Sequence, residues 1–162
     1  MGRVHRQDAK SARDRKRELV NTQMTEKRPG PEDTELRENV IARIAVDAMI
    51  EVHRELGPGL LESSYRHCLA YELHQRGLNV ESEVALPLAF KGVKLDAGYR
   101  IDLWIERTVI VEVKSVDALH PIHTAQVLTY LKLTGNRLGL LVNFNEKLVR
   151  DGIRRLVNNL PE

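Results

Sequence analysis

The sequence predicts an α/β fold in which a mixed β-sheet core is flanked by helices. Apolar residues recur with the spacing of an amphipathic helix over residues 34–56 and again over 60–76. An alternation with a period of two then begins at Val80 and is typical of half-buried strands. An apolar strand, a helix and a second apolar strand follow over residues 108–144, which favours one parallel pair of strands. The hairpins before this unit favour antiparallel pairs, so the sheet is expected to be mixed.

Residues 1–33 differ in composition from the rest of the chain. Residues 1–28 hold nine Lys or Arg against four Asp or Glu, a balance of +5, whereas the remaining 134 residues carry a balance of −3. The first segment has few apolar residues and closes on Arg28-Pro29-Gly30-Pro31. We therefore expect a disordered basic tail, within which Met24 is an alternative start, followed by one domain over residues 34–162.

The composition also excludes several classes of protein. With a single cysteine, Cys68, the chain cannot form an intrachain disulfide, and the apolar helical setting of this residue favours a buried thiol over a nucleophile. No apolar run reaches the length of about 18 residues that a membrane span requires. No cysteine or histidine partners have zinc spacing. We expect a cytoplasmic protein.

Two helices are expected at the start of the domain. The first ends at Gly57-Pro58-Gly59, because glycine supplies a left-handed cap and proline cannot continue the helix. The second runs from about Leu60 to Arg76, with Gly77 as its terminator. Its buried side is expected to contain Tyr65 and the leucines of the same stripe.

The second half of the chain predicts strands and one further helix. Lys91-Gly92 is a hairpin turn signal, and Glu106-Arg107 is expected to form another turn. Pro121 opens a helix at the position where proline is tolerated, and Gly135 caps it after Thr134. The expected strands cover residues 80–87, 88–90, 93–95, 99–105, 108–113 and 138–144, and residues 148–160 form a short strand, a loop or a last helical turn.

Three charged residues interrupt the apolar strands. If the segments on either side of the turn at residues 106–108 pair as a hairpin, Asp102 and Glu112 lie across from each other, and Glu112 and Lys114 share one face. Burying two carboxylates together is costly, and a divalent cation relieves their repulsion. Oxygen ligands with retained waters suit Mg²⁺, and Lys114 could then orient an attacking water.

An acidic residue followed by Glu-x-Lys on the next strand resembles the motif of the PD-(D/E)XK nuclease superfamily, with Ile101 in place of its loosely kept proline. Downstream, Gln126 and Tyr130 match the Gln-x-x-x-Tyr motif of the RecB-like branch. Upstream, Gly59-Leu60-Leu61-Glu62-Ser63-Ser64-Tyr65 resembles the Gly-x-x-Glu-x-x-Tyr motif of the small GxxExxY proteins. The resemblance covers residues 39–157.

This resemblance implies a restriction-endonuclease-like fold and hydrolysis of nucleic-acid phosphodiester bonds with Mg²⁺ or Mn²⁺. It assigns the metal to Asp102, Glu112 and the carbonyl of Val113, and the attacking water to Lys114. The expected substrate is DNA in preference to RNA, no membrane is involved, and a homo-oligomer is compatible with the sequence. The resemblance further implies that Glu62 supports the metal or its water, and that Gln126 and Tyr130 position the nucleic-acid backbone or Lys114.

Each of these residues also has a purely structural explanation. Glu62 could be a first-turn carboxylate stabilised by the helix dipole, and Gln126 and Tyr130 could simply pack a helix on the sheet. A non-catalytic nucleic-acid-binding or protein-interaction module that retains the fold therefore stays open, as does a subunit of a larger assembly. An aromatic content of 4% and the negative balance outside the tail favour the module. A capping or surface role is expected for His120 and His123.

Overall fold

The computed structural model describes residues 31–160 of the chain, so the prediction of a disordered tail before residue 31 lies outside the described residues. None of the helices in this part of the chain is long and apolar enough to cross a membrane. In chain order the elements are α2 (Pro31–Leu56), α3 (Glu62–Gln75), β1 (Val80–Phe90), β2 (Val93–Ile105), β3 (Val109–Lys114), α4 (Pro121–Thr134), β4 (Leu138–Asn143), the 3₁₀ helix η1 (Val149–Gly152) and β5 (Ile153–Val157).

The five strands form one sheet in the order β1-β2-β3-β4-β5. β3 and β4 run parallel, and every other neighbouring pair is antiparallel. α4 connects the two parallel strands, which confirms the strand–helix–strand unit of the sequence. β3 and β4 are buried along almost their whole length, as expected of apolar strands that are covered on both faces. The predicted mixed sheet flanked by helices is therefore confirmed.

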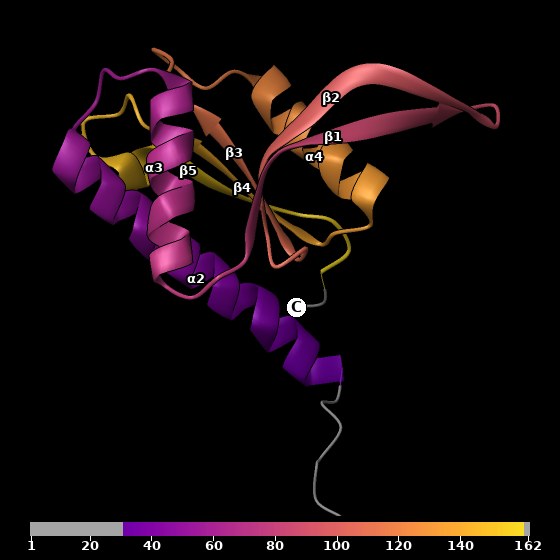
Figure 1. Cartoon of the computed structure of the whole chain (residues 1–162), viewed down its shortest axis with the longest axis horizontal. Coiled ribbons are helices and arrows are strands. Elements are labelled where there is room, and N and C mark those ends of the chain that lie inside the picture. Colours follow the sequence, from indigo (N-terminus) through magenta and orange to yellow (C-terminus); the bar gives the residue numbers. More distant parts are fainter. Residues whose placement is uncertain (1–30, 161–162) are drawn as a thin grey trace, which may run out of the picture. The chain divides into compact units, whose positions relative to one another are not determined.

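Helices cover both faces of this sheet (Figure 1). α2 and α3 pack on one face, where Met49 and Leu69 join a core that includes Leu103 and Val111. α4 packs on the other face through Val127, Tyr130 and Leu131, which contact Ile101, Ile110 and Leu141. The odd-numbered residues of β3 thus belong to the first core and Ile110 to the second, so Glu112 and Lys114 lie on the side of α4.

The prediction of separate strands at 80–87 and 88–90, and at 93–95 and 99–105, was wrong, because each of these pairs forms one continuous strand. β1 runs through Pro87 to Phe90, and β2 runs from Val93 through to Ile105. Pro87 is tolerated because β1 is an edge strand and its register against β2 shifts between Leu86 and Leu88. The turn at Lys91-Gly92 is as predicted, and both residues have positive φ values, +49° and +77°.

The helix boundaries follow the local signals closely. α4 spans Pro121–Thr134 with Gly135 at a φ of +74°, so its predicted start and end are both confirmed. α3 begins at Glu62, two residues after the predicted start, and α2 begins at Pro31, three residues before Thr34. At the end of the domain, η1 and β5 show that residues 148–160 contain both a helical turn and a short strand.

Candidate active site

The antiparallel pairing of β2 with β3 ends one step before the predicted site. The paired residues are Leu103 with Val111, Trp104 with Ile110 and Ile105 with Val109, and Glu106 and Arg107 turn the chain with φ near +50°. Asp102 and Glu112 would form the next pair of this register, but no pairing continues there. The strands therefore separate at the position where the sequence places its two carboxylates.

The carboxylate of Asp102 fills the gap between the two strands. Its Oδ2 accepts the backbone N–H of Val113 at 2.9 Å, so the side chain satisfies a donor that a neighbouring strand would otherwise satisfy. Its neighbours Ile101 and Leu103 are both fully buried but belong to opposite cores, which shows that the alternation of β2 is interrupted here. Glu83, opposite Asp102 in the register of β1, has a φ of +53° and belongs to the same interruption.

Glu112 is the most deeply buried charged residue of the site, with 2% of its surface exposed. Its Oε1 accepts a hydrogen bond from Lys114 Nζ at 2.8 Å, but its Oε2 is buried without any hydrogen-bond partner. Burial raises the pKa of Glu112 to about 7, and the charges of Asp102 and Glu62 act in the same direction against the opposing effect of Lys114. The single hydrogen bond and the positive charge of Lys114 therefore compensate only part of the cost of burying this carboxylate.

The other two residues of the trio respond to the same environment. Burial raises the pKa of Asp102 above its usual value, although the Val113 N–H and the charges of Arg66 and Lys114 oppose it. Burial lowers the pKa of Lys114, but its hydrogen bond to Glu112 and the nearby carboxylates outweigh that effect, so the pKa of Lys114 is raised overall. Lys114 is therefore a cation at neutral pH and cannot act as a base there.

Glu62 is the first residue of α3, and its charge acts on both Glu112 and Lys114. It therefore belongs to the same electrostatic cluster, while its predicted role in supporting a metal or its water stays a prediction. Residues 31–160 contain no group of three or more His, Cys, Asp or Glu side chains placed to hold a metal ion. A metal at this site would thus depend on two carboxylates with water and substrate oxygens, which is the coordination that Mg²⁺ commonly has in proteins.

Gln126 and Tyr130 lie one turn apart on α4, and Gln126 Nε2 donates a hydrogen bond to the Tyr130 hydroxyl at 2.7 Å. Tyr130 is 1% exposed and packs in the core beneath α4, with Tyr99 edge-on to its ring at 6.3 Å. Burial raises the pKa of Tyr130, and the charges of Glu112 and Asp102 add to this shift. The pair therefore borders the carboxylate cluster, while its role in contacting substrate or Lys114 stays a prediction.

Sequence reasoning missed Arg66, which lies one helical turn after Glu62. Its Nη1 is 3.5 Å from Asp102 Oδ1, and its Nη2 is 3.2 Å from Glu83 Oε1. Its Nε is buried and has no partner. The spacing of four residues from Glu62 was a signal that the two side chains share a face of α3, but the ion pair with Asp102 depends on the tertiary fold.

Asn143 was also missed, and it supports the loop that follows Lys114. It is fully buried and stands opposite Lys114 in the parallel pairing of β3 with β4. Its Oδ1 accepts the N–H of Val116 at 3.0 Å, and its Nδ2 donates to the Val116 carbonyl at 2.8 Å. A single asparagine that ends an otherwise apolar strand was the available signal.

At the start of α4, His123 Nδ1 accepts the N–H of His120 at 3.2 Å, which confirms the capping role expected there.

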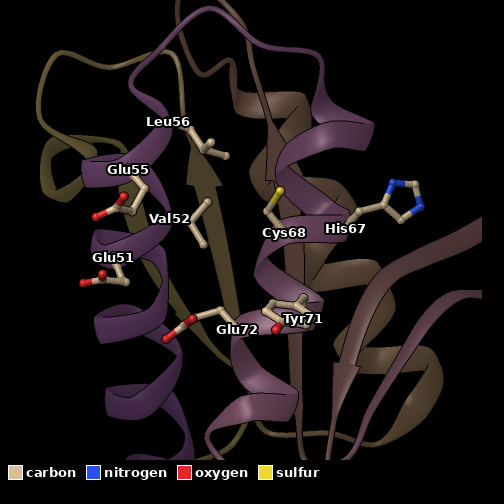
Figure 2. A pocket seen from close by; sticks show the side chains of 8 residues that line it. All are labelled: Glu51, Val52, Glu55, Leu56, His67, Cys68, Tyr71 and Glu72. Carbon is tan, nitrogen blue, oxygen red and sulfur yellow. The ribbon is translucent and has the colours of Figure 1, made fainter.

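A groove of about 380 Å³ lies between α2 and α3, and it contains none of the residues of the candidate site. Figure 2 shows Cys68 turned toward the space between these helices, whereas His67 points away from it. The residues that line the groove are Glu51, Val52, Glu55, Leu56, His67, Cys68, Tyr71 and Glu72.

Comparison with known proteins identifies the fold family. A family model described as the PD-(D/E)XK nuclease superfamily matches residues 39–156, which contain α3, α4, β1 to β4, most of α2 and all of β5 except its last residue. The matched region contains Asp102, Glu112 and Lys114. No curated protein matches the chain, and no solved structure matches it.

Proposed function

Because the chain belongs to the PD-(D/E)XK nuclease superfamily and has its restriction-endonuclease-like fold, we propose that Asp102, Glu112 and Lys114 form the active site of a Mg²⁺-dependent nuclease. The reaction is hydrolysis of a phosphodiester bond in nucleic acid, with DNA as the favoured substrate. The observation that supports the proposal best is Glu112 Oε2, a buried carboxylate oxygen without a hydrogen-bond partner.

An unpaired buried carboxylate oxygen costs free energy in a purely structural site. Loss of the hydrogen bonds of a charged group costs about 1–3 kcal/mol or more, and sequences usually avoid such positions in the absence of a function. A divalent cation beside Asp102 and Glu112 would remove this cost and reverse the upward shift of the Glu112 pKa. The donor set of two carboxylates and the Val113 carbonyl is suited to Mg²⁺ or Mn²⁺, and nucleases of this superfamily generally use divalent metal ions.

The bound metal would polarise a phosphoryl oxygen and lower the pKa of a coordinated water. The side chains of the chain itself supply positioning and charge. Asp102 is held between the Val113 N–H and Arg66, so its free lone pairs have a fixed direction. Lys114, which is charged at neutral pH, orients the attacking water through its N–H groups and stabilises negative charge on the phosphate. Glu62 contributes a further carboxylate near Lys114.

A cleavage assay tests the proposal directly. Supercoiled plasmid, single-stranded DNA and RNA are incubated with Mg²⁺, with Mn²⁺ or with a chelator. The wild-type chain is expected to cut at least one substrate in the presence of metal only, and Lys114→Ala and Asp102→Ala are expected to lose about 100-fold or more of the rate. Equal cleavage by both variants and the wild type would show that the assigned site is wrong or that a contaminant cuts.

Glu38→Gln is a matched control for the site variants. Glu38 is also a buried carboxylate, 4% exposed, and it pairs with Arg137, directly before β4. Because β3 and β4 are parallel, this pair lies at the opposite end of the sheet from Glu112. The control variant is therefore expected to keep its metal-dependent cleavage. Calorimetric titration with Mn²⁺ adds a second readout, because a chain without any binding would instead be a non-catalytic module.

Within the superfamily, we also assign the chain to the GxxExxY proteins. Two features of the motif support this assignment. Glu62 begins α3 beside the site, and the Tyr65 hydroxyl donates to the Gly57 carbonyl at 2.5 Å while it accepts the Leu60 N–H at 3.1 Å. The tyrosine thus fixes the loop that leads to the glutamate.

A cytoplasmic location and a homo-oligomer are parts of the same proposal, and the mass of the native particle tests the second of them.

A further inference from the structure

The outer half of the β1–β2 hairpin extends beyond the rest of the sheet (Figure 1). Every residue from Ala89 to Asp96 is exposed, including the large apolar side chains of Phe90 at 59%, Val93 at 58% and Leu95 at 42%. We call residues 86–100 the arm. We propose that the arm binds nucleic acid with unpaired bases and directs the strand toward Asp102, an inference that rests on the proposed nuclease function.

The apolar residues of the arm share one face. Leu88 pairs with Leu95, and Phe90 pairs with Val93, so these four side chains lie on the same side of the hairpin. The register shift between Leu86 and Leu88 places its two extra residues on β2, so alternation along β1 puts Leu86 on this side as well. Leu86 packs against the core beneath α4. The exposed apolar face of the arm is therefore a continuation of the face that α4 covers, on the side where Glu112 and Lys114 lie.

The arm and the candidate site are joined by the same strand, β2. β2 contains the second strand of the arm and also Asp102. Arg100, the last residue of the arm, lies two residues before Asp102. Tyr99, near the inner end of the arm, lies edge-on to the ring of Tyr130, which borders the site. The register against β1 places Val93 opposite Phe90 and Ile101 opposite Val84, so the distance along the hairpin from Val93 to Asp102 is about 23 Å. A nucleic-acid strand that lies along this face would reach the carboxylates with its backbone.

Charge distinguishes the arm from its surroundings. The arm contains Lys91, Lys94 and Arg100 against one acid, Asp96, a balance of +2. Residues 29–162 together carry −3, so the part of the domain outside the arm carries −5. A phosphate backbone is attracted to positive charge, so the net positive charge of the arm makes it suited to bind one.

The exposed ring of Phe90 beside a lysine favours a nucleic-acid partner with unpaired bases. Phe90 exposes more than half of its surface, and Lys91 Nζ lies over its ring at 5.4 Å from the centroid. Bases of a single strand stack on such rings regardless of sequence, while long basic side chains reach the neighbouring phosphates. A duplex keeps its base faces covered and can use only the charges.

A second copy of the chain fits the arm less well. The four apolar side chains expose an area on the order of 300 Å², whereas stable interfaces bury about 800 Å² per partner. Two arms that packed face to face would also bring two positive segments together. Both arguments favour an anionic partner over self-association.

The test measures binding separately from cleavage. Full-length Lys114→Ala protein is titrated, in chelator, into a fluorescent single-stranded oligonucleotide and into the duplex of the same sequence, with anisotropy as the readout at several salt concentrations. In this background, Lys91→Glu/Lys94→Glu is expected to weaken both affinities about tenfold and to reduce the salt dependence. Lys132→Glu/Lys147→Glu, with the same change of charge at exposed positions outside the arm, is the matched control and is expected to weaken them less than threefold.

Phe90 provides the base-specific part of the test. Phe90→Ala is expected to weaken single-strand binding about fivefold and duplex binding less than twofold, and Phe90→Trp is expected to restore the loss. Circular dichroism checks that each variant is folded. Unchanged single-strand affinity in Phe90→Ala, or an equal loss in the Lys132/Lys147 control, would overturn the proposal. A native dimer that Phe90→Ala dissociates would overturn it too, because the apolar face would then be a self-interface.

The outcome is separable from that of the proposed function. If the arm variants bind normally while the wild type still cuts, the arm proposal fails and the nuclease proposal stands. If the wild type never cuts but the arm variants lose binding, the nuclease proposal fails and the arm remains a nucleic-acid-binding element.

Discussion

Substitution of Glu112 by Gln is expected to make the metal-free protein more stable at alkaline pH. The change keeps the shape of the side chain but removes the charge that burial opposes. In the folded chain the pKa of Glu112 is raised from 4.5 to about 7, so the folded state holds this proton more tightly than the unfolded chain does. Ionisation of Glu112 therefore destabilises the folded state. Because glutamine cannot ionise, the difference in stability between the variant and the wild type measures this cost.

The sign and size of the effect follow from this difference. Below pH 4.5 Glu112 is protonated in both states and costs nothing; as pH rises toward 7, the unfolded chain loses its proton first and stability falls. Above pH 7 the loss is complete, and a difference of about 2.5 pKa units corresponds to about 3 kcal/mol. The gain in Glu112→Gln is smaller than this because Lys114 loses its charged acceptor. For a domain of this size, the upper limit corresponds to about 10 °C in Tm.

Thermal unfolding followed by circular dichroism measures the effect in chelator at pH 4.5 and pH 8. Glu112→Gln is expected to match the wild type at pH 4.5 and to have the higher Tm at pH 8. Glu38→Gln serves as the control and is expected to lower the Tm at pH 8, because Arg137 loses a partner whose oxygens are 3.1 Å away. Addition of Mg²⁺ should raise the Tm of the wild type and of Glu38→Gln, but not that of Glu112→Gln. A Glu112→Gln protein that is no more stable than the wild type at pH 8 would refute this account of the site.

Three further substitutions test the support of the site. Gly152→Ala is expected to destabilise the protein by about 2 kcal/mol or more in urea unfolding, because its Cβ would lie 2.5 Å from the backbone oxygen of Asn143, which cannot move as a side chain can. Asn143→Leu leaves two polar backbone groups of Val116 unpaired, so we expect a loss of about 2–4 kcal/mol in unfolding and slower cleavage by the protein that remains folded. Tyr65→Phe removes the hydrogen bond to Gly57, with an expected cost of about 1–2 kcal/mol measured by the same method.

The elements with local signals could be predicted from the sequence, and those that depend on pairing could not. Pro121 and Gly135 mark the ends of α4 through their own backbone preferences, so both ends were predicted correctly. Pro87 has an equally clear local signal, yet β1 continues through it. The reason is the shifted register of an edge strand, a property of two strands together that the sequence of one strand does not contain.

The same distinction applies to the candidate site. Glu112 and Lys114 could be identified because they are charged residues at the end of a strand whose other members are buried. Their short separation within β3 made their shared face certain. Arg66, by contrast, reaches Asp102 from a different element, 36 positions earlier in the chain. In the sequence, Arg66 is an ordinary charged residue of an amphipathic helix, and such a pattern does not predict a contact with another element.

The point at which the β2–β3 pairing ends explains why the site is located there. β3 is paired on both sides as far as Val111, but beyond it only β4 continues alongside, as far as Lys114 and Asn143. The open side of β3 leaves the Val113 N–H available, and Asp102 takes it. A continuous sheet would have satisfied the Val113 N–H with backbone and left no gap for the Asp102 carboxylate. The interruption therefore lacks ladder hydrogen bonds at this point and leaves Glu112 buried with only partial compensation. The stability that Glu112→Gln should recover measures the free energy that the fold gives up to keep this carboxylate at the proposed metal site.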